Sequence, residues 1–187
     1  MDNGVRSIAN MITLSRMILV PLFIGLTIYD RYGWAVIVFV TAGVTDALDG
    51  YLARRLKQET YLGSVLDPIA DKILIISGIV TLSFAGTNPI PKWLAVTVIS
   101  RDALITLPSL CILLIVGKLD FKPTWLGKSC TAIQITTLSF FLLFNYLEKT
   151  NLILVILCWI TMAATVSSGS HYLYRTLRWM AAQNNDS

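Results

Sequence analysis

Long apolar stretches separated by short polar connections dominate the chain. Six of them can be laid out, near residues 8–28, 34–54, 66–86, 91–116, 128–147 and 151–174. Each reaches about the 20 residues that a helix needs to cross a hydrocarbon core of ~30 Å. The stretches are continuously apolar, whereas strands of a membrane β-barrel alternate polar and apolar residues. The pattern therefore predicts an all-α integral membrane protein, a compact bundle of six transmembrane helices.

The composition supports this class. Of the 187 residues, 55% are hydrophobic and only 14% are charged, which is unlike an ordinary soluble domain. Arg16 interrupts the first apolar stretch and no small-residue cleavage site follows it, so we expect the first helix to be retained. The three cysteines lack CxxC spacing and are interpreted as packing residues. No internal repeat or long linker divides the chain, which predicts a single domain over residues 1–187.

The Lys and Arg residues are unevenly distributed between the predicted connections. One set of alternate connections, with both termini, carries Arg6, Arg54, Arg55, Lys57, Lys118, Lys122, Lys128, Arg175 and Arg178. The other set carries only Arg31, Lys92 and Lys149. By the positive-inside rule, this asymmetry predicts that both termini are cytoplasmic. The net charge of +4 is then mainly a topology signal and gives no support for nucleic-acid binding.

Carboxylates lie at one depth on two of the predicted helices. The uncharged run Gly33–Thr45 has thirteen residues, or ~20 Å of helix, so Asp46 falls inside the cytoplasmic half of the membrane. The uncharged run Ile73–Ala85 mirrors it, because Asp67 and Asp71 precede that run. An active site at the cytoplasmic edge of the membrane is the expectation.

The spacing gathers these acids on helix faces. Four residues of the second predicted helix share a stripe at i, i+3, i+4 and i+7, namely Asp46, Asp49, Gly50 and Ala53, and Asp67 and Asp71 are one turn apart. A lone carboxylate at this depth costs about 2.5–3.5 kcal/mol, so four of them require cations, partners or water. Clustered carboxylates offer the hard oxygen ligands that Mg²⁺, Mn²⁺ and Ca²⁺ favour. The pattern predicts a metal site.

Two alternatives compete with this interpretation. Asp67 before Pro68 has the form of a helix N-cap followed by proline at the first helical position. A cation- or proton-coupled transporter would also carry intramembrane acids, although such sites usually lie at the midplane between inverted repeats, which this sequence lacks.

Together the residues form the pattern DxxDGxxAR, eight residues, then GxxxDxxxD, carried by Asp46, Asp49, Gly50, Ala53, Arg54, Gly63, Asp67 and Asp71. This pattern resembles the motif of the CDP-alcohol phosphotransferase family, with every defining position present. The stretches NMITLSRMILVPLF, LGSVLDPIADKILI, ISRD and GKSCTAIQ are similar to the branch of that family that makes phosphatidylglycerol and cardiolipin.

The resemblance implies an enzyme of anionic phospholipid synthesis. It implies that Asp46, Asp49 and Asp67 hold two Mg²⁺ ions, or Mn²⁺ in their place, with Asp71 near the metals and acting as the general base. It further implies that CDP-diacylglycerol is bound with the help of Asp46, Gly50, Ala53, Arg54 and Gly63. The acceptor hydroxyl would displace CMP directly, without a covalent enzyme intermediate, and members of the family often form homodimers.

The sequence is less informative about the acceptor than about the donor. Arg101, Lys128 and Lys72 are the candidates for binding its phosphate. The alternatives are an ion pair of Arg101 with Asp102 and an ordinary loop charge at Lys128. We place glycerol 3-phosphate first. Phosphatidylglycerophosphate synthases usually add an arginine and a lysine where this chain has Ser109 and Cys130, so phosphatidylglycerol is the alternative acceptor. Inositol phosphate, serine and choline-type acceptors stay open.

Overall fold

The structure is a computed structural model. It describes the backbone of residues 18–43, 61–116 and 125–184, and the side chains of residues 18–43, 72–108 and 125–175. The described backbone is helical and contains no strand. Its elements are Ile18–Ile28, Tyr32–Gly43, α3 (Tyr61–Phe84), α4 (Lys92–Val116), α5 (Trp125–Tyr146) and α6 (Leu152–Asn184). The prediction of an all-helical protein is confirmed.

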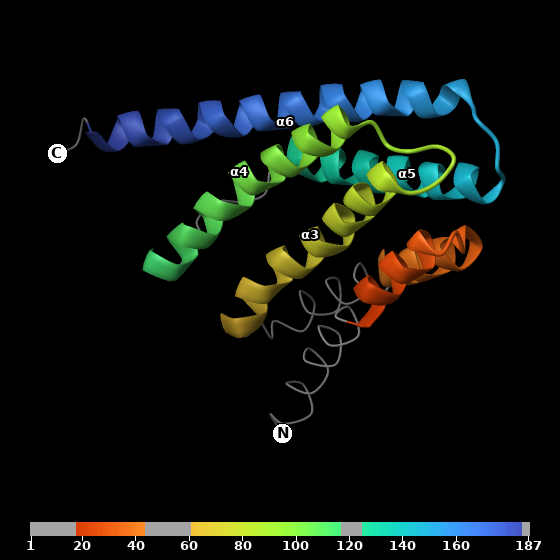
Figure 1. Ribbon diagram of the computed structural model, residues 1–187. Coiled ribbons are helices and arrows are strands. Elements are labelled where there is room, and N and C mark those ends of the chain that lie inside the picture. The colour runs from red at the N-terminus through yellow and green to blue at the C-terminus, as the bar shows by residue number, and fades with distance from the viewer. Residues whose placement is uncertain (1–17, 44–60, 117–124, 185–187) are drawn as a thin grey trace.

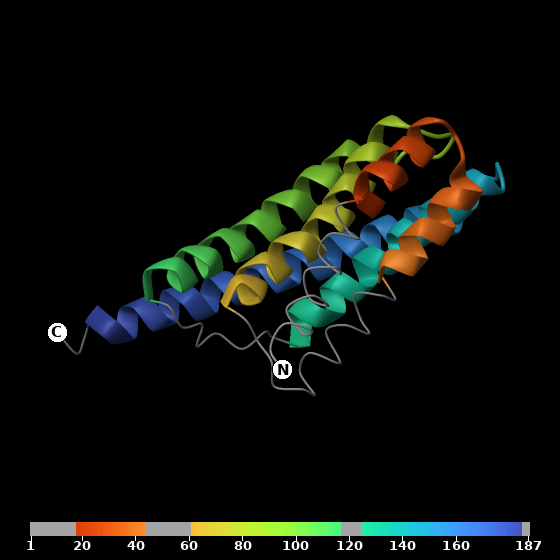
Figure 2. The ribbon, with the colours of Figure 1, turned by 90° about the horizontal axis from the view of Figure 1, so that it is seen from below.

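The helices form an elongated bundle. α5 and α6 run side by side in opposite directions, α4 packs against α6, and α3 contacts both α4 and α5 (Figure 1). The two N-terminal helices, drawn in red and orange, cover the opposite side of α3 and α5 (Figure 2). The C-terminal end of α6 extends beyond the other helices. One end of the bundle consequently contains the starts of α3 and α5 together with the later halves of α4 and α6.

One apolar core joins these helices. Phe23, Leu82, Val98, Leu138 and Leu142 are among its fully buried members. Many large apolar side chains are exposed on the outside, including Trp34, Leu104 and Trp159, as a lipid-facing surface requires. In the described part of the chain, two segments are long and apolar enough to cross a membrane, Trp125–Tyr146 and Leu152–Arg175. These features support a membrane protein.

The start of α3 corrects one sequence-based alternative. α3 begins at Tyr61, so Asp67 and Pro68 lie well inside the helix and the N-cap interpretation is wrong. The preceding residues, LGSVL, are themselves compatible with a helix. A proline inside a membrane helix is tolerated because neighbouring groups can satisfy the freed backbone carbonyl. Asp67 therefore needs another explanation than capping.

The end of α6 differs from the expected span. The helix continues to Asn184, ten residues past the predicted boundary at 174. The hydrophobic stretch ends there, but the following residues include Leu, Arg, Met, Ala and Gln, all of which favour helix, and neither Gly nor Pro. The apolar span therefore ends before the helix does, because the residues that follow are more polar but still favour helix.

Hydrogen bonds fix the end of the bundle that carries the α3–α4 connection. The buried Asn145 of α5 accepts from the backbone N–H of Asn88 at 2.8 Å and donates to the Asn88 carbonyl at 3.1 Å. Gly86 adopts a φ of 94°, and a Cβ there would lie 2.5 Å from Asn145 Oδ1. Glycine is required at this close approach. The network fixes the spacing of α3, α4 and α5, and with it the relative positions of their other ends.

Candidate active site

The predicted metal and donor residues divide into two groups. Five of them, Asp46, Asp49, Gly50, Ala53 and Arg54, lie outside the described residues. The other three, Gly63, Asp67 and Asp71, lie four residues apart on the backbone of α3 and therefore share one face of that helix. In residues 18–43, 72–108 and 125–175, no group of three His, Cys, Asp or Glu side chains could hold a metal ion. The ligand set stays a prediction based on the chemistry of carboxylates.

A charged cluster of three helices begins one residue after Asp71. Lys72 of α3 places Nζ 2.9 Å from Oδ2 of Asp102 on α4. Arg101 Nη1 donates to Oδ1 of the same carboxylate at 2.6 Å. Oδ2 is buried, and Lys72 is its cationic partner among the described residues. On the far side, Arg101 Nη2 donates to the hydroxyl of Ser168 on α6.

Arg101 and Asp102 of this cluster are deeply buried in an apolar bundle, whereas Lys72 is partly buried. Arg101 is 6% exposed and Asp102 is 1% exposed. Burial of a charge is tolerated only when it is paired and hydrogen-bonded. The alternative weighed for Arg101, an ion pair with Asp102, is thus present. Contact of Arg101 with an acceptor phosphate remains a prediction, and its buried Nε has no partner among the described residues.

The sequence of α6 explains how Arg101 reaches Ser168. Gly169 lies beside the arginine stem, and a Cβ there would lie 3.4 Å from Arg101 Cγ. Thr161, Thr165 and Ser168 follow one face of α6 at i, i+4 and i+7 and are all buried. Sequence reasoning missed Ser168, although this spacing of hydroxyl residues was the signal that could have found it.

The same hydroxyl face of α6 meets α5. The hydroxyls of Thr137 and Thr161 are 2.7 Å apart, and Cys130 Sγ lies 3.8 Å from Thr165 Oγ1. Cys130 is 1% exposed. Position 130 is where phosphatidylglycerophosphate synthases usually have a lysine. Cys130 contacts Thr165, which is one helical turn from Ser168, the partner of Arg101. The interpretation of Cys130 as a packing residue agrees with this burial.

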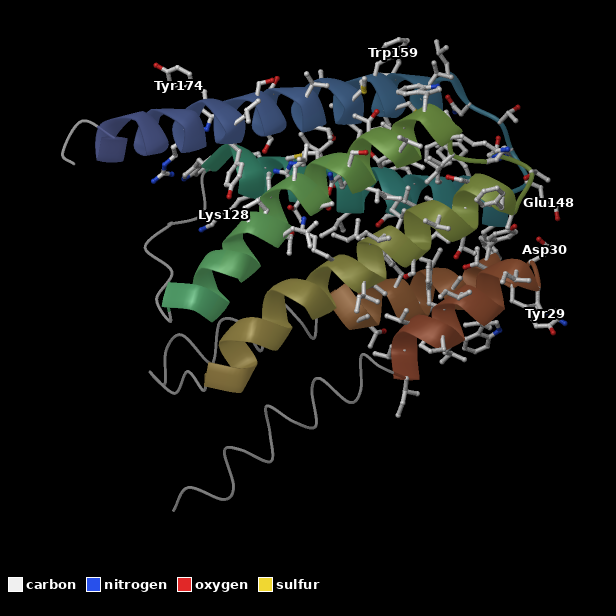
Figure 3. The ribbon with its side chains drawn as sticks, turned by 60° about the vertical axis from the view of Figure 1, so that its left-hand side comes forward. Tyr29, Asp30, Lys128, Glu148, Trp159 and Tyr174 are labelled. Atoms are coloured by element: carbon white, nitrogen blue, oxygen red, sulfur yellow. The ribbon has the colours of Figure 1, made fainter. Side chains whose placement is uncertain are left out.

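Lys128, the third candidate for acceptor binding, is exposed at the start of α5. It lies at the same end of the bundle as Tyr174, whereas Tyr29, Asp30 and Glu148 lie at the opposite end (Figure 3). The structure thus brings Lys72 and Arg101 together on Asp102, with Lys128 separate from that ion-pair group. A groove of about 560 Å³ lined by Asp30, Tyr32 and Tyr146 is at the far end and is remote from these residues.

A model of the CDP-alcohol phosphatidyltransferase family matches residues 6–167, which include all eight motif positions and the Arg101–Asp102 pair. The chain belongs to this family. It is accordingly a transferase of phospholipid biosynthesis, as the resemblance predicted. The same match covers Ser109 and Cys130, the two positions where the chain departs from the usual phosphatidylglycerophosphate synthase pattern.

The relatives of this chain are named either as cardiolipin synthases or as enzymes that make phosphatidylglycerophosphate. The chain is 34% identical to the human cardiolipin synthase (CMP-forming), over 90% of this chain and 61% of that protein. It is 31% identical to a Mycobacterium tuberculosis protein named "Probable phosphatidylglycerophosphate synthase", over 93% of this chain and 83% of the relative. It is 34% identical to the CDP-diacylglycerol–glycerol-3-phosphate 3-phosphatidyltransferase of Blochmanniella floridana, over 91% of each chain. Sequence similarity alone therefore does not distinguish glycerol 3-phosphate from phosphatidylglycerol as the acceptor.

Proposed function

We propose that the protein transfers the phosphatidyl group of CDP-diacylglycerol to a glycerol-phosphate-type acceptor and releases CMP. The observation that carries this proposal is the complete eight-position motif inside the matched family region. The names of the relatives support the donor and both acceptors. Glycerol 3-phosphate, which would give phosphatidylglycerophosphate, is the acceptor predicted first from the sequence.

In this mechanism Asp46, Asp49 and Asp67 would hold two Mg²⁺ ions, whose positive charge would stabilise the negative charge that develops during the displacement. Asp71 accepts the proton of the acceptor hydroxyl. The hydroxyl oxygen forms a bond to the phosphatidyl phosphorus as the bond from that phosphorus to the CMP oxygen breaks.

The donor is held by the remaining motif residues. Gly50 and Ala53 leave room for the cytidine nucleotide, and Gly63 closes the pocket. Arg54 contacts the diphosphate, because the planar fork of a guanidinium suits phosphate oxygens. The acyl chains of the donor remain in the bilayer. The headgroup then reaches the carboxylates at the cytoplasmic edge.

Phosphatidylglycerol is the second candidate acceptor, which would give cardiolipin. One structural observation favours it: Asp102 already pairs with both Arg101 and Lys72, so little positive charge is left for a small phosphate monoester. The absence of basic residues at Ser109 and Cys130 acts in the same direction.

The membrane arrangement is part of the proposal. We place six spans in the bilayer with both termini and the active site on the cytoplasmic side. Helices α3 to α6 have 24, 25, 22 and 33 residues and are each long enough to cross ~30 Å. A homodimer is a further expectation from the family.

The test is a headgroup assay on the purified full chain in detergent. Radiolabelled CDP-diacylglycerol and Mg²⁺ are offered with glycerol 3-phosphate or with phosphatidylglycerol in separate tubes. CMP release with a phosphatidylglycerophosphate or cardiolipin product supports the proposal and identifies the acceptor. Absence of CMP with both acceptors would contradict it, and would agree with a transporter.

A further inference from the structure

We propose that Ser168 of α6 is a positioning residue for the phosphatidyl transfer, because it fixes the orientation in which the Arg101 guanidinium meets the phosphate of the acceptor. This inference rests on the proposed function and on the predicted contact of Arg101 with the acceptor. It holds equally for glycerol 3-phosphate and for phosphatidylglycerol, since both carry a phosphate group. Ser168 is outside the eight-position motif and lies one residue past the matched family region.

The first observation is that the guanidinium is held at both of its terminal nitrogens. Arg101 Nη1 donates to Asp102 Oδ1 at 2.6 Å, and Nη2 donates to the Ser168 hydroxyl. Asp102 follows Arg101 on α4, so their contact by itself joins the guanidinium to its own helix. Ser168 comes from α6, 67 residues further along the chain. Because a guanidinium is a rigid plane, a second contact from another helix at the opposite nitrogen sets the direction of that plane.

The second observation is the burial of this contact. Arg101 is 6% exposed and Ser168 is 3% exposed. Water that could replace the hydroxyl has little access to such a position, and a buried donor that loses its partner is costly. Without the Ser168 hydroxyl, the guanidinium is therefore expected to turn toward another acceptor atom and lose its fixed orientation.

The third observation is a donor that the two contacts leave free. Nε of Arg101 is buried and has no hydrogen-bond partner among the described residues. A guanidinium has five N–H groups in a fixed fork, which matches the oxygens of a phosphate. With Nη1 and Nη2 held by Asp102 and Ser168, Nε keeps one fixed direction, and a phosphate oxygen of the acceptor would satisfy it. Fixing the fork before the acceptor arrives reduces the entropy that is lost on binding.

The competing explanation is that Ser168 only satisfies a buried charge and thereby stabilises the bundle. A role of that kind would change stability without a selective effect on the acceptor. Thr161 offers a matched comparison, because it is buried on the same face of α6 and its hydroxyl is 2.7 Å from that of Thr137 on α5. Thr161→Val removes one buried hydroxyl contact of α6 that does not involve Arg101.

The experiment measures kcat and KM for the acceptor, and the KM for CDP-diacylglycerol, on the purified full chain in detergent. Glycerol 3-phosphate and phosphatidylglycerol are assayed in separate tubes. The variants are Ser168→Ala, which removes the hydroxyl, Ser168→Thr, which keeps it, and the control Thr161→Val. Size-exclusion chromatography and thermal unfolding report the assembly and the stability of each variant.

Ser168→Ala should raise the KM for the acceptor by at least about tenfold, because a hydrogen bond to a charged group is worth that factor or more. The kcat and the KM for CDP-diacylglycerol should be unchanged, since the lost contact binds the ground state and the transition state equally. Ser168→Thr should return the acceptor KM toward the wild-type value. Thr161→Val should lower the thermal stability and leave the acceptor KM as in the wild type.

A double-mutant cycle tests whether Ser168 acts through Arg101. Arg101→Lys keeps the positive charge but lacks the planar fork that reaches Asp102 and Ser168 together. In that background, Ser168→Ala should raise the acceptor KM no further. An increase of the same size with and without Arg101 would mean that Ser168 acts independently of it, and would overturn the inference.

Two further results would overturn it. They are an acceptor KM in Ser168→Ala equal to that of the wild type, or KM values for acceptor and donor that rise together. If Ser168→Ala does not assemble, Ser168→Cys takes its place, because a thiol is a weak acceptor, and the same acceptor-selective rise in KM is expected. Absence of CMP from the wild type with both acceptors is a different outcome, because it contradicts the proposed function itself.

Discussion

Single polar residues in this bundle are explained by their partners. Arg101 is buried among apolar helices, where an unpaired guanidinium would be unstable. It is stabilised by the carboxylate of Asp102 on the same helix and by the hydroxyl of Ser168 on α6. Asp102 in turn reaches Lys72, the neighbour of the predicted base Asp71. The pairing thus connects the acceptor residues to the helix that carries half of the acidic motif.

The base assignment gives the first prediction at this scale. Asp71→Asn should lower the rate of CMP release by roughly 10²–10⁴-fold, because an amide cannot take the proton of the acceptor hydroxyl. The measurement is the initial rate of CMP release, with size-exclusion chromatography to confirm assembly. Asp30→Asn is the matched control, since Asp30 lies at the far end of the bundle and an amide Oδ1 can still accept from the Tyr32 hydroxyl. Activity retained in Asp71→Asn would remove the base assignment.

The metal assignment gives the second prediction. Asp46→Asn and Asp67→Asn should each raise the Mg²⁺ concentration for half-maximal activity by at least about tenfold, because each loses a charged oxygen ligand. Titration of Mg²⁺ in the CMP assay measures this, again with Asp30→Asn as control. Superimposable Mg²⁺ curves for variant and wild type would show that these carboxylates are not ligands.

At the scale of elements, close contacts between helices set the geometry of the site. α3 approaches α5 at Gly78, where a Cβ would lie 2.5 Å from Leu138 Cδ2. Leu138 is 1% exposed and has little room to move. Eight residues further along the chain, Gly86 and Asn145 hold the α3–α4 connection against α5. The position of Lys72 relative to Asp102 depends on both contacts.

The Gly78 contact gives the third prediction. Gly78→Ala should destabilise the bundle by about 1–3 kcal/mol through overpacking, which corresponds to roughly 2–4 °C per kcal/mol for a chain of this size. Thermal unfolding in detergent is the measurement. Gly25→Ala is the control, because a Cβ there meets nothing within 4 Å. An equal effect of the two substitutions would mean that the α3–α5 contact is not tight.

At the scale of the whole molecule, the bundle has two chemically different ends. Lys128 lies at the end where α3 begins, and the α5–α6 connection, with Glu148, lies at the other. Lys72 and Arg101 lie near the middle of α3 and α4. If that first end faces the cytoplasm, the Lys and Arg asymmetry of the connections and the depth of the acids have one common explanation.

The orientation gives the fourth prediction. In a cysteine-free background, Thr150→Cys in the α5–α6 connection should react with an impermeant maleimide in intact cells, whereas Ser187→Cys should react only after the membrane is opened. Thr150 is exposed, so a lack of reaction would not follow from burial. Labelling of both positions from the same side would contradict the assignment of α6 as a complete span.

The sequence by itself determined the class of protein, the approximate helices and the family. These follow from apolar run length, from charge distribution and from a motif of fixed spacing, and all three are properties of residues near one another in the chain. The boundaries of α3 and α6 were less predictable, because hydrophobicity marks where a span ends and backbone hydrogen bonding decides where a helix ends. The ligand roles of the four aspartates are still predictions from the motif.

Only the tertiary structure decided which charges neutralise one another. Lys72 and Asp102 are 30 residues apart and Arg101 and Ser168 are 67 residues apart, so no local pattern could pair them. The sequence presented Arg101, Lys72 and Lys128 as candidate acceptor-binding cations, with an Arg101–Asp102 ion pair and an ordinary loop charge at Lys128 as the alternatives. Packing of α3, α4 and α6 put two of them on one buried carboxylate and left Lys128 exposed, because a charge in an apolar bundle must find a partner and only the fold determines which partner is within reach.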